Sequence, residues 1–256
     1  MFEKYFMTKS FYFSYDYDLT HPFSTSAQRN FGNGEYDERF YYNSTFTYKL
    51  RERNLEYWVQ PFICGLVVQR LLNINQKAFS FILISRRDKS RAGMRFISRG
   101  SDAQGNVSNF AETEQILTFI NEESYDVYTY LQIRGSIPII WKQSPNLKWT
   151  PKLMIEENLM KNKSAFKYHI SKIKKAYGDN HFVNLIDKKG SQKIIGEFLT
   201  EMIKTENDPK IHYTWFDFHH ECKKMQWHHL SKLVNELLDN IQKYKYGHYR
   251  VSKTVA

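Results

Sequence analysis

A run of basic side chains in SRRDKSRAGMRFISRG, residues 85–100, is the strongest local feature of the sequence. Six of the fourteen residues from 86 to 99 are basic and one is acidic. If residues 93–99 form a strand, Arg95 and Arg99 share one face, and an earlier start of that strand adds Arg91 to the row. Because a guanidinium group binds phosphate through two donors at once, the row indicates an anion-binding surface.

Ordinary ion pairing is the competing interpretation of this basic run. Glu112 and Glu114 follow just beyond a turn. A carboxylate can pair with an arginine that lies opposite it on an adjacent strand. Spacing alone leaves both interpretations open.

Cys64 and Arg70 match the spacing Cys-x5-Arg, which cysteine phosphatases use to attack a phosphorus atom and to bind the phosphate oxygens. That chemistry needs a tight loop whose amide groups all point at the anion. The intervening residues are GLVVQ, an apolar run typical of a strand. We therefore interpret the match as a coincidence. Cys222 has His228, and no arginine, at the corresponding spacing.

A cluster of possible metal ligands consists of His219, His220, Glu221, Cys222, His228 and His229. Two ligands on one helix face need a spacing of three or four residues. Only His219 and Cys222 have this spacing. The sequence pattern places His219 at the end of a strand, and therefore not on one helix with Cys222. We interpret the group as structural or exposed histidines and expect no metal and no cofactor. Glycine-rich nucleotide loops and serine-hydrolase motifs do not occur.

Hydrophobic periodicity predicts two differently built halves. Strand patterns occur at residues 11–17 and repeatedly from Trp58 to Arg134, with a hairpin turn at Ser101–Asn106 and a loop over residues 21–45. Helices are predicted over residues 156–177, 191–204 and 223–242, and strands over residues 182–187 and 211–219. The predicted fold class is α/β, a mixed β-sheet flanked by helices. We expect one domain over residues 1–256, mainly β in 1–150 and alternating between helix and strand in 151–256.

Composition excludes several classes of protein. The chain has 256 residues, a net charge of +10, 11 glycines, 6 prolines and 2 cysteines, which excludes collagen-like chains and disulfide scaffolds. No apolar run reaches the roughly 18 residues that a transmembrane helix needs. The positive charge favours anionic partners. Nucleic acid is disfavoured because the aromatic residues follow the periodicity of a core.

Five segments together resemble the Sac family of phosphoinositide phosphatases. They keep the family's order and spacing and cover nearly the whole chain: FYFSYDYDLT (11–20), ISRRDKSRAGMRFISRGSDAQGNVSNFAETEQ (84–115), YLQIRGSIPIIWKQ (130–143), VNLIDKKGSQKIIG (183–196) and FDFHHECKKMQW (216–227). The second segment, with RAGMR, SRG, GNV and ETEQ, is specific to that family.

The resemblance implies an enzyme that removes a monoester phosphate from phosphatidylinositol phosphates, with the 4-phosphate favoured, through a cysteinyl-phosphate intermediate and without a metal ion. The resemblance also implies that its partners are phosphoinositide lipids at a membrane surface. Its implied localisation is cytoplasmic and peripheral on endomembranes. The family's catalytic Cys-x5-Arg loop lies downstream of the FDFH segment. We therefore expect a partial Sac domain without that loop and without the family's N-terminal subdomain, and no catalytic residue in these 256 residues.

The resemblance also implies which side chains lie near the lipid headgroup or support the catalytic loop. They are Arg91, Arg95, Arg99, Asn106, Asn109, Glu112 and Arg134. An alternative function is a non-catalytic basic module that binds anionic membrane lipids.

Overall fold

The computed structural model describes residues 10–26, 35–93, 98–143 and 151–253. The chain divides into two compact units. The first unit contains residues 1–92, 110–134 and 246–256, and the second contains residues 93–109 and 135–245. The two units therefore do not correspond to the change in the sequence, near residue 150, from strand patterns to alternating helix and strand patterns. The expected single domain stays a prediction.

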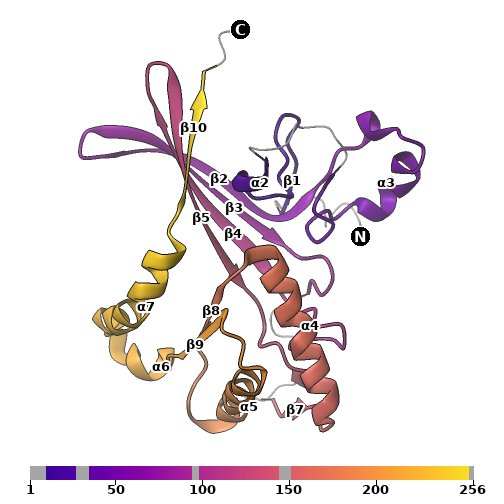
Figure 1. Cartoon of the computed structure of the whole chain (residues 1–256), viewed down its shortest axis with the longest axis vertical. Coiled ribbons are helices and arrows are strands. Elements are labelled where there is room, and N and C mark those ends of the chain that lie inside the picture. Colours follow the sequence, from indigo (N-terminus) through magenta and orange to yellow (C-terminus); the bar gives the residue numbers. More distant parts are fainter. Residues whose placement is uncertain (1–9, 27–34, 94–97, 144–150, 254–256) are drawn as a thin grey trace. The chain divides into compact units, whose positions relative to one another are not determined.

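A six-stranded antiparallel sheet forms the first unit (Figure 1). Its strands, in spatial order, are β1 (Phe11–Tyr12), β2 (Ile63–Ile74), β3 (Lys77–Arg87), β4 (Ala111–Ile120), β5 (Ser124–Arg134) and β10 (Gly247–Ser252). The four strands predicted from alternating or apolar runs at β2 to β5 are confirmed.

Two predictions in the N-terminal segment were only partly right. The strand expected over residues 11–17 is limited to Phe11–Tyr12, which pair with Cys64 and Ile63. The expected loop over residues 21–45 contains a short helix, α2 (Phe23–Ser26), and the start of α3 (Ser44–Arg51). A turn of 3-10 helix, η1 (Glu56–Trp58), precedes β2.

One face of this sheet is its core side. The register places Ile84, Ile116 and Val127 on that face, and each is at most 4% exposed. Because side chains alternate along a strand, the same register turns three ionisable side chains, Arg86, Glu112 and Glu114, into the core.

The second unit alternates strands and helices, as the sequence predicts. It contains β6 (Trp141–Gln143), β7 (Leu153–Ile155), α4 (Leu159–Tyr177), β8 (Asn180–Asn184), α5 (Gly190–Glu206), β9 (Ile211–Trp215), α6 (Phe218–Glu221), η2 (Lys223–Met225), η3 (Trp227–His229) and α7 (Leu230–Tyr244). β8 and β9 are parallel and joined through α5, whereas β6 and β7 form an antiparallel pair. Together with the first unit's sheet, this arrangement confirms the predicted α/β class.

The helices of the second unit bury the faces that their periodicity predicts, with one exception. α4 buries Phe166, Ile170 and Ile173, and α5 buries Ile195, Leu199 and Met202. None of the residues of α7 is buried, although its apolar residues share one face. The predicted helix over 223–242 was too long at its start, because Lys224 and Met225 have positive φ angles and interrupt it.

The strand predicted over 211–219 was too long at its end. β9 stops at Trp215, and Asp217 begins α6 by accepting a hydrogen bond from the backbone N–H of His220. An aspartate at this position satisfies an amide that the helix itself leaves unpaired. In the described part of the chain, no helix is both long enough and apolar enough to cross a membrane.

Candidate functional site

A buried ion cluster links β3 and β4 in the first unit. Arg86 donates to Glu112 (Nη1 to Oε1, 2.5 Å) and to Glu114 (Nη2 to Oε2, 3.0 Å). The side chains of Arg86 and Glu112 are 0% exposed, and that of Glu114 is 2% exposed. Arg39 also lies near Glu112, with Nη2 3.9 Å from Oε2. Buried charges persist only when they are paired in this way.

The cluster contains two carboxylates for one fully buried guanidinium group, and its pKa values follow from this. Burial raises the pKa of Glu114, and the nearby Arg86 opposes that rise without cancelling it. Burial alone would lower the pKa of Arg86, but attraction to Glu112 and Glu114 outweighs it and raises that pKa. Burial and the nearby Glu114 also raise the pKa of Tyr17. Arg86 is therefore held charged, while burial makes the charged form of Glu114 less favourable.

The cluster decides between the two interpretations of the basic run for one arginine. Glu112 does pair with an arginine of that run across adjacent strands, but the partner is Arg86, which lies opposite it in the ladder. Glu112 is one of the residues predicted near the headgroup or supporting the catalytic loop. Its carboxylate faces the core of the first unit.

The turn predicted at residues 101–106 is a compact loop closed by an antiparallel bridge between Ser101 and Val107. Asp102 organises it by accepting hydrogen bonds from the backbone N–H of Asn106 at 2.8 Å and from the Asn106 amide at 2.9 Å. The same Asn106 accepts a hydrogen bond from Lys172 of α4, Nζ to Oδ1, at 2.6 Å. Asn106, a predicted site residue, thus joins the loop to a helix.

Gly105 brings this loop into direct contact with α4. Its φ is +77°, and a Cβ there would lie 2.5 Å from the backbone nitrogen of His169. The ring Nδ1 of His169 lies 3.0 Å from the carbonyl oxygen of Gly105. Burial lowers the pKa of His169 to about 4, so the ring is neutral near pH 7 and donates to that carbonyl.

The predicted arginine row lies partly in irregular backbone. Gly93, Ser98 and Arg99 are outside any strand, so the expected strand over 93–99 was wrong at both ends. Residues 94–97, which include the predicted site residue Arg95, lie outside the described residues. Arg91 is in a turn of the first unit, and Arg99 belongs to the second unit, with its guanidinium carbon 5.8 Å from the ring centroid of Trp141.

Two further predicted residues occupy defined backbone positions. Asn109 adopts a left-handed conformation, φ +56°, and its side chain donates to the carbonyl oxygen of Ser98 at 3.1 Å. An asparagine tolerates this conformation better than most residues do. Arg134 is the last residue of β5 and is exposed. The structure therefore brings Asn109 together with the residues next to Arg99, and presents Arg134 to solvent.

Neither cysteine has the surroundings of a phosphatase nucleophile. Cys64 is 7% exposed and lies within β2, in the same strand as Arg70. Six residues of strand span about 20 Å, so Arg70 cannot bind a phosphate held at Cys64. This extended geometry differs from the tight loop that the chemistry of a Cys-x5-Arg motif needs. Cys222 is 6% exposed at the end of α6.

Side chains of the histidine cluster form local hydrogen bonds. His219 pairs with Asp187 (Nδ1 to Oδ1, 2.7 Å), and Nδ1 of His229 lies 2.7 Å from the carbonyl oxygen of Glu221. Glu221 also accepts a hydrogen bond from Lys232 at 2.8 Å. Among residues 10–26, 35–93, 98–143 and 151–253, no group of three or more His, Cys, Asp or Glu side chains could hold a metal ion.

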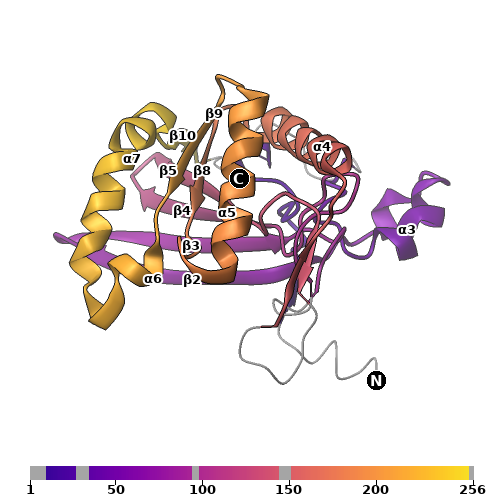
Figure 2. The same ribbon diagram turned by 90° about the horizontal axis from the view of Figure 1, so that it is seen from below.

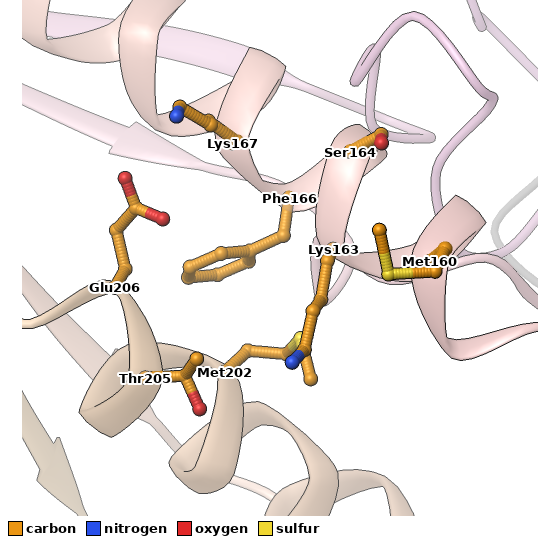
Figure 3. Close-up of a pocket in the computed structure, with 8 residues that line it drawn as sticks. All are labelled: Met160, Lys163, Ser164, Phe166, Lys167, Met202, Thr205 and Glu206. Carbon is orange, nitrogen blue, oxygen red and sulfur yellow. The ribbon is translucent and has the colours of Figure 1, made fainter.

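A cavity of about 270 Å³ lies between α4 and α5 (Figure 3). Its lining includes Phe166 and Met202, which are 2% and 3% exposed. Its remaining lining residues are Met160, Lys163, Ser164, Lys167, Thr205 and Glu206. Of the predicted site residues that the structure describes, none lines this cavity.

Comparison with known proteins assigns the chain to a family. A family model described as the SacI homology domain matches residues 1–223. The chain is 42% identical over 250 residues to phosphatidylinositol-3-phosphatase SAC1 of Saccharomyces cerevisiae, covering 93% of this chain and 39% of that protein. It is 35% identical to phosphatidylinositol-3-phosphatase SAC1-A of Danio rerio, covering 96% of this chain and 42% of that protein.

A more distant relative is phosphatidylinositide phosphatase SAC2 of Mus musculus, 31% identical over 91% of this chain and 23% of that protein. The chain belongs to the SacI homology domain family, which the sequence resemblance predicts. It spans about two-fifths of the length of the SAC1-type relatives named here.

Sequence reasoning missed the buried cluster at Arg86. It found Glu112 and Glu114 but did not identify Arg86 as their shared partner. It also assigned no role to Phe23, whose backbone N–H donates to Glu114 at 2.8 Å. The available signal was the alternation of the two glutamates in AETEQILTF, which turns both toward one face of a strand.

Proposed function

We propose that the protein to which these residues belong removes a monoester phosphate from phosphatidylinositol phosphates. The observation that carries the proposal is the match of the SacI homology domain model to residues 1–223, because the relatives reported above are named as phosphatases of phosphatidylinositol lipids. The substrate class, a phosphorylated inositol headgroup at a membrane surface, follows from those names. A peripheral position on cytoplasmic membranes is part of the same proposal.

The proposed reaction follows the family's cysteinyl-phosphate route. A thiolate attacks phosphorus, the bond to the inositol oxygen breaks, and the departing oxygen takes a proton. Water then cleaves the phosphorus–sulfur bond and releases phosphate. Such a step depends on a thiolate held among amide donors and an arginine that stabilise the charge on the transferring group.

These 256 residues alone are proposed not to carry out that reaction. Cys64 lies in a strand and Cys222 has no arginine at the required spacing, so neither can serve as the nucleophile. Burial in an apolar setting also leaves a thiol inert. The chain's own contribution is then to bind the headgroup and to support a catalytic loop from elsewhere.

The roles we propose for individual residues follow their surroundings. Arg134 and Arg91 supply positive charge from the first unit, and Arg99 supplies it from the second. Asn106 and Asn109 hold the loop that precedes β4, and Glu112 holds β4 to β3. Arg95 is assigned with the other arginines on the basis of the sequence alone.

The test uses phosphate release from short-chain phosphatidylinositol monophosphates. We expect no turnover by the 256-residue chain and turnover after fusion to the segment that follows the matched region in the Saccharomyces cerevisiae relative. The same fusion with its catalytic cysteine replaced by serine is the control. Turnover by the unfused chain that is lost in Cys64→Ser or Cys222→Ser would contradict the proposal.

The position of the phosphate is a separate part of the proposal. Family resemblance favours the 4-phosphate, whereas two relatives are named for the 3-phosphate. Assay of the active fusion on the 3-, 4- and 5-monophosphates at equal concentration decides the position. Faster phosphate release from the 3-phosphate isomer would contradict our expectation that the 4-phosphate is preferred.

A second candidate function is a non-catalytic module that binds anionic membrane lipids. The net charge of +10 and the exposed Arg134 favour it. Binding to phosphoinositide vesicles without turnover, even in the fusion, would support this function. Comparison with oligonucleotide binding at equal salt tests our expectation that nucleic acid is not a partner.

A further inference from the structure

The distal part of the β2–β3 hairpin diverges from the β4–β5 hairpin, although the ring of Phe79 still contacts that of Phe119. We call residues 70–79 the hairpin tip. β2 and β3 pair as far as Ile74 and Lys77, whereas β4 pairs with β3 only as far as Ser80 and Thr118. Three residues of β3 therefore extend past that point, about 10 Å at the usual rise of a strand. β2 and β3 lie side by side in Figure 2, and their shared turn diverges from the β4–β5 turn in Figure 1.

Aliphatic side chains are exposed on both faces of the hairpin tip. Leu72 and Ile74, on one face, are 42% and 60% exposed, and Leu71, on the other, is 81% exposed. A ribbon that packs on a protein core buries one face and exposes the other to water. Aliphatic groups on both faces suit surroundings that enclose the ribbon from all sides.

The charge of the hairpin is of one sign. Residues 57–87 contain no aspartate or glutamate, while Arg70 and Lys77 lie in the hairpin tip itself. Basic residues near an anionic lipid surface are attracted to it. Their long aliphatic stems can remain among apolar groups while the charged ends reach the headgroups.

The turn at the end of the tip is compact and uncharged. Asn75 and Gln76 have φ angles of +51° and +64°, as a two-residue hairpin turn of the type that follows strand twist requires. The charged residue next to the turn is Lys77, which lies opposite Ile74 in the ladder. Its long aliphatic stem lets the ammonium group reach back to the headgroups, so its charge need not be buried.

We propose that the hairpin tip inserts into the interfacial layer of a bilayer that contains anionic lipid. Leu71, Leu72 and Ile74 enter the boundary between headgroups and acyl chains, and the charged ends of Arg70 and Lys77 reach the headgroups. Elements that rest in this layer bury about 5–10 Å of their depth, which matches the length of the hairpin beyond the last pair of β3 with β4. The inference deepens the proposed function, on which the choice of a membrane as partner rests.

A fluorescent probe at the tip tests the insertion. Ile74→Cys in the full chain is labelled with nitrobenzoxadiazole, and Cys64 and Cys222, at 7% and 6% exposed, resist labelling. Tyr57→Cys, at a residue 93% exposed in the same unit, is the matched control. On adding vesicles of phosphatidylcholine and phosphatidylserine, we expect a blue shift at position 74 and none at position 57. No shift at position 74, or equal shifts at both positions, would overturn the inference.

Substitution of the tip gives a second, independent readout. We expect Leu71→Ser with Ile74→Ser to lower partition onto the same vesicles about tenfold, which corresponds to about 1.4 kcal/mol. Phe46→Ser with Leu55→Ser, also at exposed apolar residues of the first unit, should leave the partition unchanged. Equal losses in both double variants would show that the tip has no special part in binding.

An interface between two copies of the chain is the competing occupant of the tip. Sedimentation equilibrium would then show a dimer that the Leu71→Ser, Ile74→Ser variant removes, and the probe at position 74 would shift without vesicles. That result would overturn membrane insertion. The vesicles contain no phosphoinositide and no phosphate release is measured. Failure of this inference is therefore distinguishable from failure of the proposed hydrolysis.

Discussion

Glu114 of β4 accepts a hydrogen bond from the backbone N–H of Phe23, at 2.8 Å, across 91 positions of sequence. Its other carboxylate oxygen accepts from Arg86 at 3.0 Å. One buried glutamate thus connects the start of the short helix α2 to the ion pairs between β3 and β4. This connection explains how an acidic residue can be 1% exposed in the core of a sheet.

Removal of the buried cation should strongly destabilise the first unit. We expect Arg86→Met to lower the free energy of unfolding by roughly 3–5 kcal/mol, because it removes the buried guanidinium group from which Glu112 and Glu114 both accept hydrogen bonds. Urea denaturation of the whole chain measures the change. Arg70→Gln, at an exposed site on the neighbouring strand β2, is the control and should change it by less than about 0.5 kcal/mol.

The same cluster predicts a partial rescue. The triple variant Arg86→Met, Glu112→Leu, Glu114→Leu should recover most of the stability that Arg86→Met loses, because no unpaired charge remains in the core. A triple variant no more stable than Arg86→Met would show that packing around the arginine, and not the unpaired charge, causes the loss.

His169 should make the stability of the second unit depend on pH. Its folded-state pKa is lowered to about 4 by burial, from a usual value near 6.5, so the unfolded chain binds more protons between these values. Stability from this residue is complete above pH 6.5 and is lost as pH falls toward 4, by about 2 kcal/mol at pH 5. The difference between wild type and His169→Gln at pH 7 and pH 5 isolates the effect. A difference that does not change with pH would contradict it.

Gly105 should tolerate no side chain, for two separate reasons. Its φ of +77° strains any other residue, and a Cβ would overlap the backbone of α4. Gly190→Ala is a matched control, because its φ is +63° but nothing lies within 4 Å of its Cβ position. We expect Gly190→Ala to cost about 1 kcal/mol and Gly105→Ala roughly 1–3 kcal/mol more. Equal costs would mean that the loop moves away from α4 without penalty.

The arginines predicted to face the headgroup can be tested as a set. We expect replacement of Arg91, Arg95 and Arg99 by glutamine to weaken binding to phosphoinositide vesicles at low salt by about 1 kcal/mol per residue. The control replaces Lys161, Lys175 and Lys204, exposed lysines of α4 and α5, by glutamine and removes the same charge. If both triple variants lose equal affinity, net charge is responsible and the arginines have no specific role.

The sequence by itself determined the family, the fold class and most of the regular elements. The apolar runs of β2 and β3 and the alternating run of β4 predict strands because side chains of a strand point to opposite faces. The apolar spacing in α4 and α5 predicts helices for the corresponding reason. The apolar run between Cys64 and Arg70 also argued against a phosphatase motif, since a strand cannot bring those two residues to one phosphate. The predicted strands and helices depend on local backbone geometry, which the order of apolar and polar residues specifies directly.

The partners of the charged residues were decided only by the tertiary structure. Glu112 pairs with Arg86 because the register of β3 against β4 places them opposite each other, and register depends on the whole sheet. Asn106 bonds to Lys172 because the loop at Gly105 packs on α4, 66 positions away. Element ends also escaped prediction, as at Asp217, where a capping hydrogen bond begins a helix inside an apparent strand. Pairing between distant residues depends on how the elements pack, and no local pattern in the sequence records it.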